Sequence, residues 1–224
     1  MKKLLKNERG NILLMTAVLL VVLLLFAGVA ADLARAWVAR EELQGAVDSA
    51  ALAGSMSAVR NVEITVQYGH LVEKTVDGKT VKSCISEPPV RLVGTEKKFI
   101  DQGGWKKGTC GDKLLGIERR WIEYPSDARS IANQILDMNW PGLLAPEGGG
   151  AKESSSVTVY DTKSAYGPSV KVNARGNVKT ALLNIVGIND LSFKRCGQSA
   201  TFYDVVVNGW LLGRNDPPQD ACKD

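Results

Sequence analysis

The first strong pattern in the chain is a long apolar run. No side chain is charged between Arg9 and Asp32, and Ile12–Ala31 is dominated by Leu, Val and Ala. A helix of this length rises about 30 Å, which matches the thickness of the hydrocarbon core of a bilayer. We therefore expect a transmembrane helix over residues 11–31.

The charges on either side of this run predict its orientation. Four basic residues lie within residues 1–10, whereas the two arginines that follow the run are interleaved with acidic residues. This bias favours a cytoplasmic leader over 1–10 and a periplasmic or extracellular C-terminal part, in a single-pass protein of the inner or cytoplasmic membrane. The alternative is a secretory signal cleaved near Ala30, because Gly28-Val29-Ala30 is a small-residue site.

A helical extension is expected over residues 32–59. Small and apolar residues repeat there at a spacing of about seven, as Leu33, Ala36, Arg40, Leu43, Val47, Ala50 and Gly54, with one arginine in the series. Such a seam packs helix on helix, and its small residues allow backbones to approach closely. It could pack only on its own domain, or also between subunits. Asp32 and Arg35 have the i,i+3 spacing of an ion pair along the helix.

An ordered set of short motifs runs through the same region. In chain order they are Arg9-Gly10, Asp32, Arg35, Trp37, Leu43-Gln44, Ala46, Asp48 and Ala50-Ala51-Leu52-Ala53. The set resembles the N-terminal segment of the TadE/TadG-like family of tight-adherence (Flp-type) pilus assembly proteins. This resemblance implies a pilin-like or accessory structural component, with other pilus subunits and membrane lipid as its partners. It also implies possible processing after Gly10, although Met15 stands where pilin-like substrates usually carry Glu.

The seam and the resemblance together mark candidate helix-packing residues. They are Asp32, Arg35, Trp37, Arg40, Leu43, Gln44, Ala46, Asp48, Ala50, Ala51 and Gly54.

Residues 60–224 are expected to form one exported α+β domain with antiparallel strands and short helices. Apolar and polar residues alternate over 62–68, and strands over 71–76 and 79–84 flank Asp77-Gly78, which predicts a type I′ hairpin turn. Residues 85–125 contain paired prolines and glycines and are expected to be irregular. Further strands are expected over 157–161, 169–174 and 199–207.

Two helices and one loop complete this expectation. A helix is predicted from Ser126 to Pro141, with Ala128, Ile131, Ile135 and Met138 on its apolar face. A second, short helix is predicted over 179–186, ending at Gly187. Residues 145–156 are rich in Gly and Ser, which predicts a flexible loop.

Four cysteines, Cys84, Cys110, Cys196 and Cys222, lie on the predicted exported side. An even number of cysteines in an oxidising compartment predicts two disulfides, for which three pairings are possible. We favour Cys84–Cys110 and Cys196–Cys222, because each closes a short loop.

Composition argues against several classes of function. The net charge is +4, but residues 1–10 hold four basic residues and one acid, so the remainder carries only +1. We therefore expect no nucleic-acid partner. The one histidine, His70, and the absence of a familiar catalytic or metal motif predict a protein that is not an enzyme, with no metal, cofactor or small-molecule substrate.

The alternative function is a membrane-anchored binding or sensor domain for an envelope polymer, glycan or small ligand. A concave pocket lined by the tryptophans between Trp105 and Trp140 would support it.

Overall fold

The structure is a computed structural model that describes residues 8–76, 78–108, 110–202, 204–207, 210–214 and 217–223. The chain divides into two compact units. Unit 1 comprises residues 1–51, 132–157 and 172–197, and unit 2 comprises 52–131, 158–171 and 198–224.

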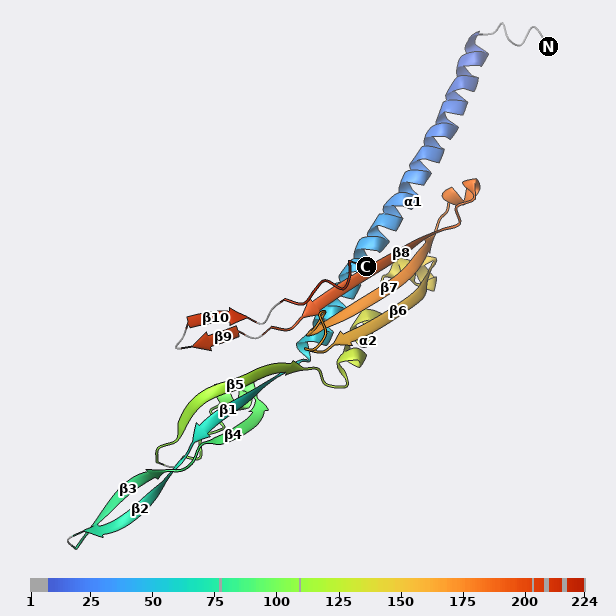
Figure 1. The fold of residues 1–224 in the computed structure, drawn as a ribbon. Helices are drawn as coiled ribbons and strands as arrows, with labels where there is room; N and C mark the ends of the chain where they lie inside the picture. Colours follow the sequence, from blue (N-terminus) through green and yellow to red (C-terminus); the bar gives the residue numbers. More distant parts are fainter. Residues whose placement is uncertain are drawn as a thin grey trace. The chain divides into compact units, whose positions relative to one another are not determined.

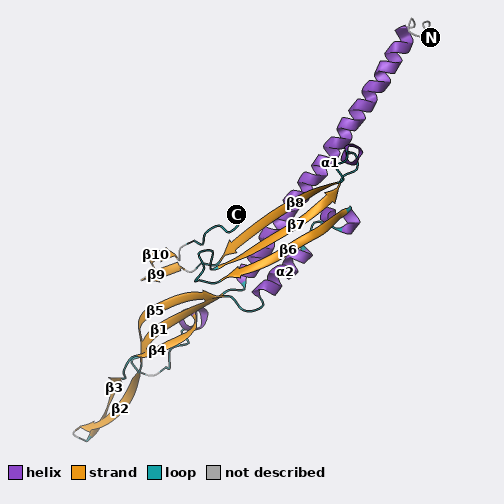
Figure 2. Cartoon of the chain, turned by 45° about the vertical axis from the view of Figure 1, so that its right-hand side comes forward, coloured by secondary structure: helices purple, strands orange, loops and turns teal. Residues whose placement is uncertain are grey.

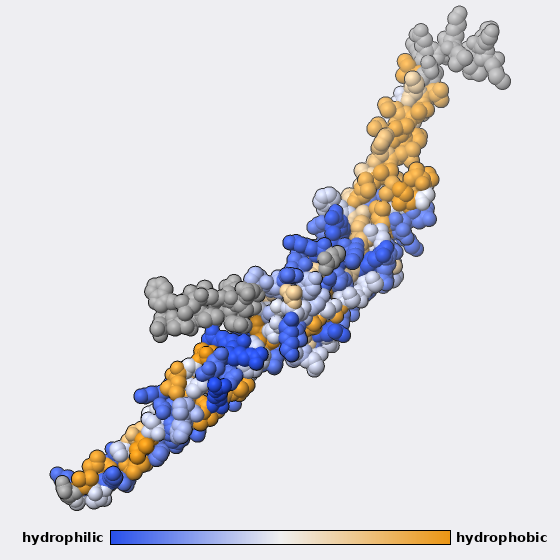
Figure 3. All heavy atoms as spheres, in the orientation of Figure 1, coloured by the Kyte–Doolittle hydropathy of each residue, from blue (hydrophilic) through white to orange (hydrophobic). Residues whose placement is uncertain are grey.

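One helix, α1, runs without a break from Glu8 to Met56 (Figure 1). Its 49 residues correspond to about 74 Å of helix. Every large apolar side chain from Ile12 to Phe26 is exposed, and these side chains form the continuous orange surface along α1 in Figure 3. The helix is long and apolar enough to cross a membrane. The expected span and the expected extension therefore form one continuous helix.

Unit 1 contains most of a three-stranded sheet whose strands are bonded in the order β6–β7–β8. The strands are β6 (Gly150–Tyr160), β7 (Ser169–Lys179) and β8 (Asp190–Ala200). In unit 1, every second residue of the central strand is buried, as at Val172, Ala174 and Val178. Helix α1 lies against this sheet in both ribbon views (Figure 2).

Helix α1 and the sheet approach each other closely at Gly197 of β8. A Cβ atom at this position would lie 2.8 Å from the backbone carbonyl of Val47 and 2.6 Å from the Asp48 carboxylate. The Gln44 side chain donates a hydrogen bond to the Cys196 carbonyl at 3.1 Å. Because β8 runs directly over the helix backbone, only glycine fits there without a local shift.

The second helix and two short turns also belong partly or wholly to unit 1. They are α2 (Ala128–Met138), η3 (Gly142–Leu144) and η4 (Pro146–Gly148). The buried face of α2 is formed by Ala128, Ala132 and Leu136, whereas Met138 is 73% exposed. Met138 was therefore wrongly expected on the apolar face, because Ala132 and Leu136 continue the buried stripe from Ala128 at i+4 and i+8.

Unit 2 is built around a sheet with the order β4–β1–β5, in which both neighbours of β1 are antiparallel to it. The strands are β1 (Val59–Gln67), β4 (Val90–Thr95) and β5 (Lys113–Glu123). The inward residues of β1, namely Val62, Ile64 and Val66, form a buried cluster with Tyr68 and Phe99. Phe99 belongs to the π-helix η2 (Lys97–Asp101).

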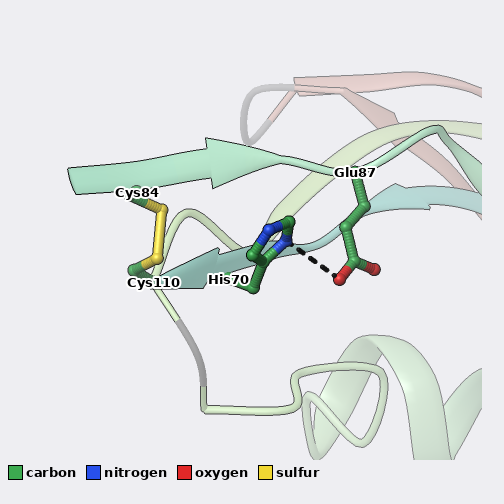
Figure 4. Close-up of a disulfide and its surroundings, with 4 residues drawn as sticks. All are labelled: His70, Cys84, Glu87 and Cys110. Atoms are coloured by element: carbon green, nitrogen blue, oxygen red, sulfur yellow. Dashed lines mark ion pairs between the residues drawn. A yellow bond between two sulfur atoms is a disulfide. The ribbon is translucent and has the colours of Figure 1, made fainter. Parts of the chain in front are cut away.

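A hairpin of β2 (Gly69–Val76) and β3 (Lys79–Ser86) belongs to the same unit. The side chains of β3 are all exposed, so hydrophobic burial does little for this hairpin. A disulfide joins Cys84 to Cys110, and His70 on β2 lies 3.4 Å from the carboxylate of Glu87 (Figure 4). This is the pairing that the sequence favoured. Cys196 and Cys222 are also disulfide-bonded.

The hairpin turn is only partly described. Gly78 has a φ of +73°, as a type I′ turn requires, but Asp77 lies outside the described residues. A further antiparallel pair, β9 (Asp204–Val207) and β10 (Trp210–Arg214), also belongs to unit 2.

Four segments differ from the sequence expectation. The strand expected over 199–207 is divided between β8, which ends at Ala200, and β9, which begins at Asp204. Residues 145–156 form η4 and the first part of β6 instead of a flexible loop, and 85–125 contain two strands. Strand pairing uses backbone groups, so Gly- and Ser-rich sequence can form a strand where a neighbour is available. The expected helix over 179–186 is reduced to the 3₁₀ helix η5 (Leu183–Val186), which Gly187 ends with a φ of +88°. The α+β class itself, with a long apolar helix followed by antiparallel sheets, is confirmed.

Two glycines offer a matched test of the contact between α1 and β8. Gly197→Ala should lower the free energy of unfolding by about 1–3 kcal/mol, because the added methyl group meets the α1 backbone. Gly45→Ala should raise it by roughly 0.5–1 kcal/mol, because Gly45 is helical and has open space around it. Denaturant unfolding of the full chain in detergent measures both values. Equal effects of the two variants would contradict the contact.

Candidate assembly site along the first helix

Asp32 lies at the end of the apolar run and is only 5% exposed. Its carboxylate accepts hydrogen bonds from the backbone N–H groups of Ala181, Leu182 and Leu183, at 2.8–3.1 Å. These groups open the 3₁₀ helix η5, and helix N-termini leave such donors unsatisfied. Asp32 thus joins α1 to the segment between β7 and β8.

These hydrogen bonds lower the pKa of Asp32 below its ordinary value of 3.8. The largest contribution comes from the Leu183 N–H, followed by that of Ala181, and the charge of Arg35 acts in the same direction. A carboxylate whose pKa is lower in the folded state stabilises the fold above its ordinary pKa. That stabilisation is lost as the pH falls through the lowered value.

A second contact joins the same two segments one helical turn closer to the N-terminus. A Cβ atom at Gly28 would lie 1.5 Å from the Leu182 side chain, so Leu182 occupies the space that any larger residue at 28 would need. Gly28 was noted in the sequence only as part of a cleavage site. The sequence signal for the segment that contacts Gly28 is the uncharged stretch around Leu182, which extends from residue 180 to residue 189.

Two further polar residues of α1 bind backbone carbonyls of unit 1. Arg35 donates to Gly148 at 3.2 Å, and Gln44 donates to Cys196 and also to the Asp48 carboxylate. These candidate residues therefore make contacts within the chain.

The small residues of the expected seam are also used within the chain. Leu43, Ala50 and Ala51 are fully buried, Ala46 is 2% exposed, and Gly54 is buried. The stripe is displaced from the heptad in two places, because Ala39 is buried where Arg40 was expected, and Leu33 is 53% exposed. A straight helix has 3.6 residues per turn, so its buried stripe drifts from a strict heptad.

The face opposite this stripe remains exposed. Its positions repeat at alternating spacings of four and three, as Ala34, Val38, Glu41, Gly45 and Asp48, and Trp37 flanks them. Trp37 is 66% exposed and Val38 is 48% exposed. We call these six residues the outer face.

Residues 10–59 match the putative Flp pilus-assembly TadE/G-like family. The resemblance recognised from the motifs is therefore confirmed over the segment that contains them. No curated protein and no solved structure matched the chain. The TadE/G-like segment includes both the buried stripe and the outer face of α1, and it ends at the first residue of β1.

The processing candidate Gly10 lies in the first turns of α1, within the TadE/G-like segment. The helix continues past this glycine without a break, and the side chains of residues 8–11 are not described.

Grooves in the described part of unit 2 include two that begin at or near the end of the TadE/G-like segment. One is lined mainly by charged and polar residues that include Arg60, Glu96, Lys97 and Asp101, and the other by residues that include Met56 and Phe202. Neither is lined by a tryptophan. Trp105, Trp121 and Trp140 are half-buried, and the side chain of Trp210 is not described. No group of three or more His, Cys, Asp or Glu among the described residues could hold a metal ion.

The role of Asp32 can be tested through its pH dependence. Asp32→Asn should expose the amides of Ala181–Leu183 to faster hydrogen exchange at pH 7. In the wild-type protein, the same amides should lose protection only as the pH falls below 3.8, after correction for the intrinsic rate. Asp48→Asn is the control, because Asp48 is exposed and its carboxylate accepts from a side chain of its own helix. Equal protection in the Asp32 and Asp48 variants would contradict the role of Asp32.

Proposed function

We propose that this protein is a membrane-anchored structural component of an Flp-type pilus assembly apparatus, and that it works by assembly instead of catalysis. The match of residues 10–59 to the TadE/G-like family supports a role in pilus assembly. The observation that supports a structural role is α1 itself, whose apolar half exposes every large side chain while its second half carries a folded unit. A surface of that kind requires lipid or other apolar helices around it.

We infer further that the outer face of α1 is where partner subunits bind. The buried stripe is already used within the chain, so its alanines are not free to pack against another helix. Trp37 and Val38 remain exposed a short distance beyond the apolar run, where a neighbouring membrane helix would also emerge. Aromatic residues are enriched at protein interfaces, and the open space at Gly45 allows a close approach.

The same geometry supports retention of the apolar run in the mature protein. Cleavage near Ala30 would remove Gly28, which contacts Leu182, and would leave Asp32 close to a new N-terminus. Asn11 would be the first residue if processing occurred after Gly10.

The alternative of an envelope-binding domain has less to support it. A pocket lined by tryptophans would support it, whereas other residues line the grooves at Arg60–Asp101 and at Met56–Phe202.

The N-terminus of the protein extracted from cell membranes tests the anchor. Intact-mass measurement should give a chain that retains Ile12–Ala31, beginning either at Met1 or at Asn11. A chain beginning near Ala31 would show a released domain and would remove the basis for assembly through α1.

Assembly through the outer face predicts a selective defect. Deletion of the gene should abolish surface pili, and the wild-type protein should restore them. The double variant Trp37→Glu, Val38→Glu should accumulate in the membrane with its disulfides intact but fail to restore pili. Val81→Glu is the control, because Val81 is also exposed, at 52%, but lies on the β2–β3 hairpin.

Electron microscopy of pili and the membrane level of each variant measure the outcome. Normal pili in the deletion strain would contradict the proposed function. Normal pili with the double variant alone would contradict only the binding role of the outer face.

A further inference from the structure

The segment between β7 and β8 exposes large apolar side chains at its tip. Residues 180–189, which we call the β7–β8 loop, contain no charged residue. Within it, Ile185 is 69% exposed, Val186 is 71% exposed and Ile188 is 43% exposed. Three neighbouring aliphatic residues on the surface of one short loop are unfavourable in water.

The position of this loop on α1 indicates what covers it. Asp32 holds its first N–H groups at the end of the apolar run, and Leu182 packs on Gly28 within that run. In both ribbon views the loop lies beside α1 at the end of the sheet nearer the N-terminus of the helix (Figures 1 and 2). The loop therefore extends along α1 from the level of Asp32 towards the segment that would lie in the bilayer.

The depth that this contact implies matches that of an interfacial segment. Gly28 and Asp32 are four residues apart, which is about 6 Å along the helix axis. Amphipathic segments that lie in a membrane interface bury their apolar side chains by about 5–10 Å. The end of the apolar run and the apolar loop thus lie within the same narrow zone.

The backbone of the loop is suited to an environment with little water. In addition to the donors held by Asp32, the N–H groups of Ile185, Gly187 and Ile188 bond to carbonyls of the loop itself. The Thr180 N–H bonds to the Asn189 carbonyl, and the Thr180 hydroxyl bonds to that of Ile188. Satisfied backbone groups of this kind are what a lipid environment requires.

We propose that the β7–β8 loop inserts Ile185, Val186 and Ile188 into the interface of the bilayer that α1 spans, in the leaflet nearer to Asp32. The occupant of this surface is membrane lipid, since the exposed loop is continuous with the lipid-facing surface of α1. This inference depends on the anchored α1 of the proposed function. The loop and the span then hold unit 1 to the membrane at two adjacent points.

Fluorescence of introduced tryptophans tests the insertion. The full chain is reconstituted in nanodiscs of phosphatidylcholine at one copy per disc. Three variants, Ile185→Trp, Val21→Trp and Val81→Trp, are compared with the parent chain by difference spectra, which remove the native tryptophans. Each is measured in unmodified lipid and in lipid brominated at a shallow or a deep position of the acyl chain.

Ile185→Trp should add blue-shifted emission that loses most of its intensity in shallow-brominated lipid and less in deep-brominated lipid. Val21→Trp, in the middle of the apolar run, should be quenched most by the deep bromines and reports the insertion of α1. Val81→Trp, on the hairpin, should emit as in water and should not be quenched.

The controls separate failure of the loop inference from failure of the proposed anchor. Quenching of Val21→Trp without quenching of Ile185→Trp would overturn the loop inference alone. If neither were quenched, the result would contradict the proposal that α1 spans the bilayer, on which the loop inference depends. Blue-shifted emission of Ile185→Trp that appears only in discs with several copies and is not quenched by brominated lipid would indicate a second copy as the occupant, which also overturns lipid insertion. Val186→Trp, equally exposed, replaces Ile185→Trp if that variant does not form both disulfides.

Discussion

The first helix has to satisfy two different solvents along its length. Up to Phe26 its large apolar side chains all face outwards, whereas beyond Asp32 a stripe of small and apolar residues is buried against the chain. A carboxylate at this transition would be unfavourable beside lipid unless it were paired. The three N–H groups of the β7–β8 loop supply that pairing, so the group that ends the apolar run also attaches the sheet to the helix.

The sequence left open whether the small residues of this helix pack within the chain or also between subunits, and the structure buries them within the chain. Alanines of the TadE/G-like segment are buried within the chain, and β8 approaches the helix backbone at Val47 where Gly197 has no side chain. A helix used in this way on one face has only the other face left for partners. Trp37 and Val38 of the outer face are therefore residues whose substitution can alter assembly without altering the fold of unit 1.

Regular periodicity allowed correct prediction of the elements that follow it. Alternation over Val62, Ile64 and Val66 identified β1, and Asp77-Gly78 located the hairpin. Leu43 and Ala50 of the heptad are buried, but the heptad placed Arg40 in the seam where the structure buries Ala39.

Contacts between distant segments could not be predicted in this way. Burial of Asp32 depends on donors about 150 residues away, which no local pattern reveals. The first part of strand β6, residues 150–156, was missed because its exposed residues are Lys, Glu and Ser, and its pairing uses backbone groups. Composition therefore indicated a loop where a neighbouring strand makes a sheet.

The attachment at Asp32 and Gly28 has a mechanical consequence. A helix that crosses a bilayer can ordinarily turn about its own axis or slide along it without disturbing a domain joined by a flexible linker. Here the membrane segment and the rest of α1 form one helix without a linker. The β7–β8 loop contacts this helix at Gly28 and Asp32. Any rotation or axial displacement of the membrane segment is therefore transmitted to the sheet as torque or thrust.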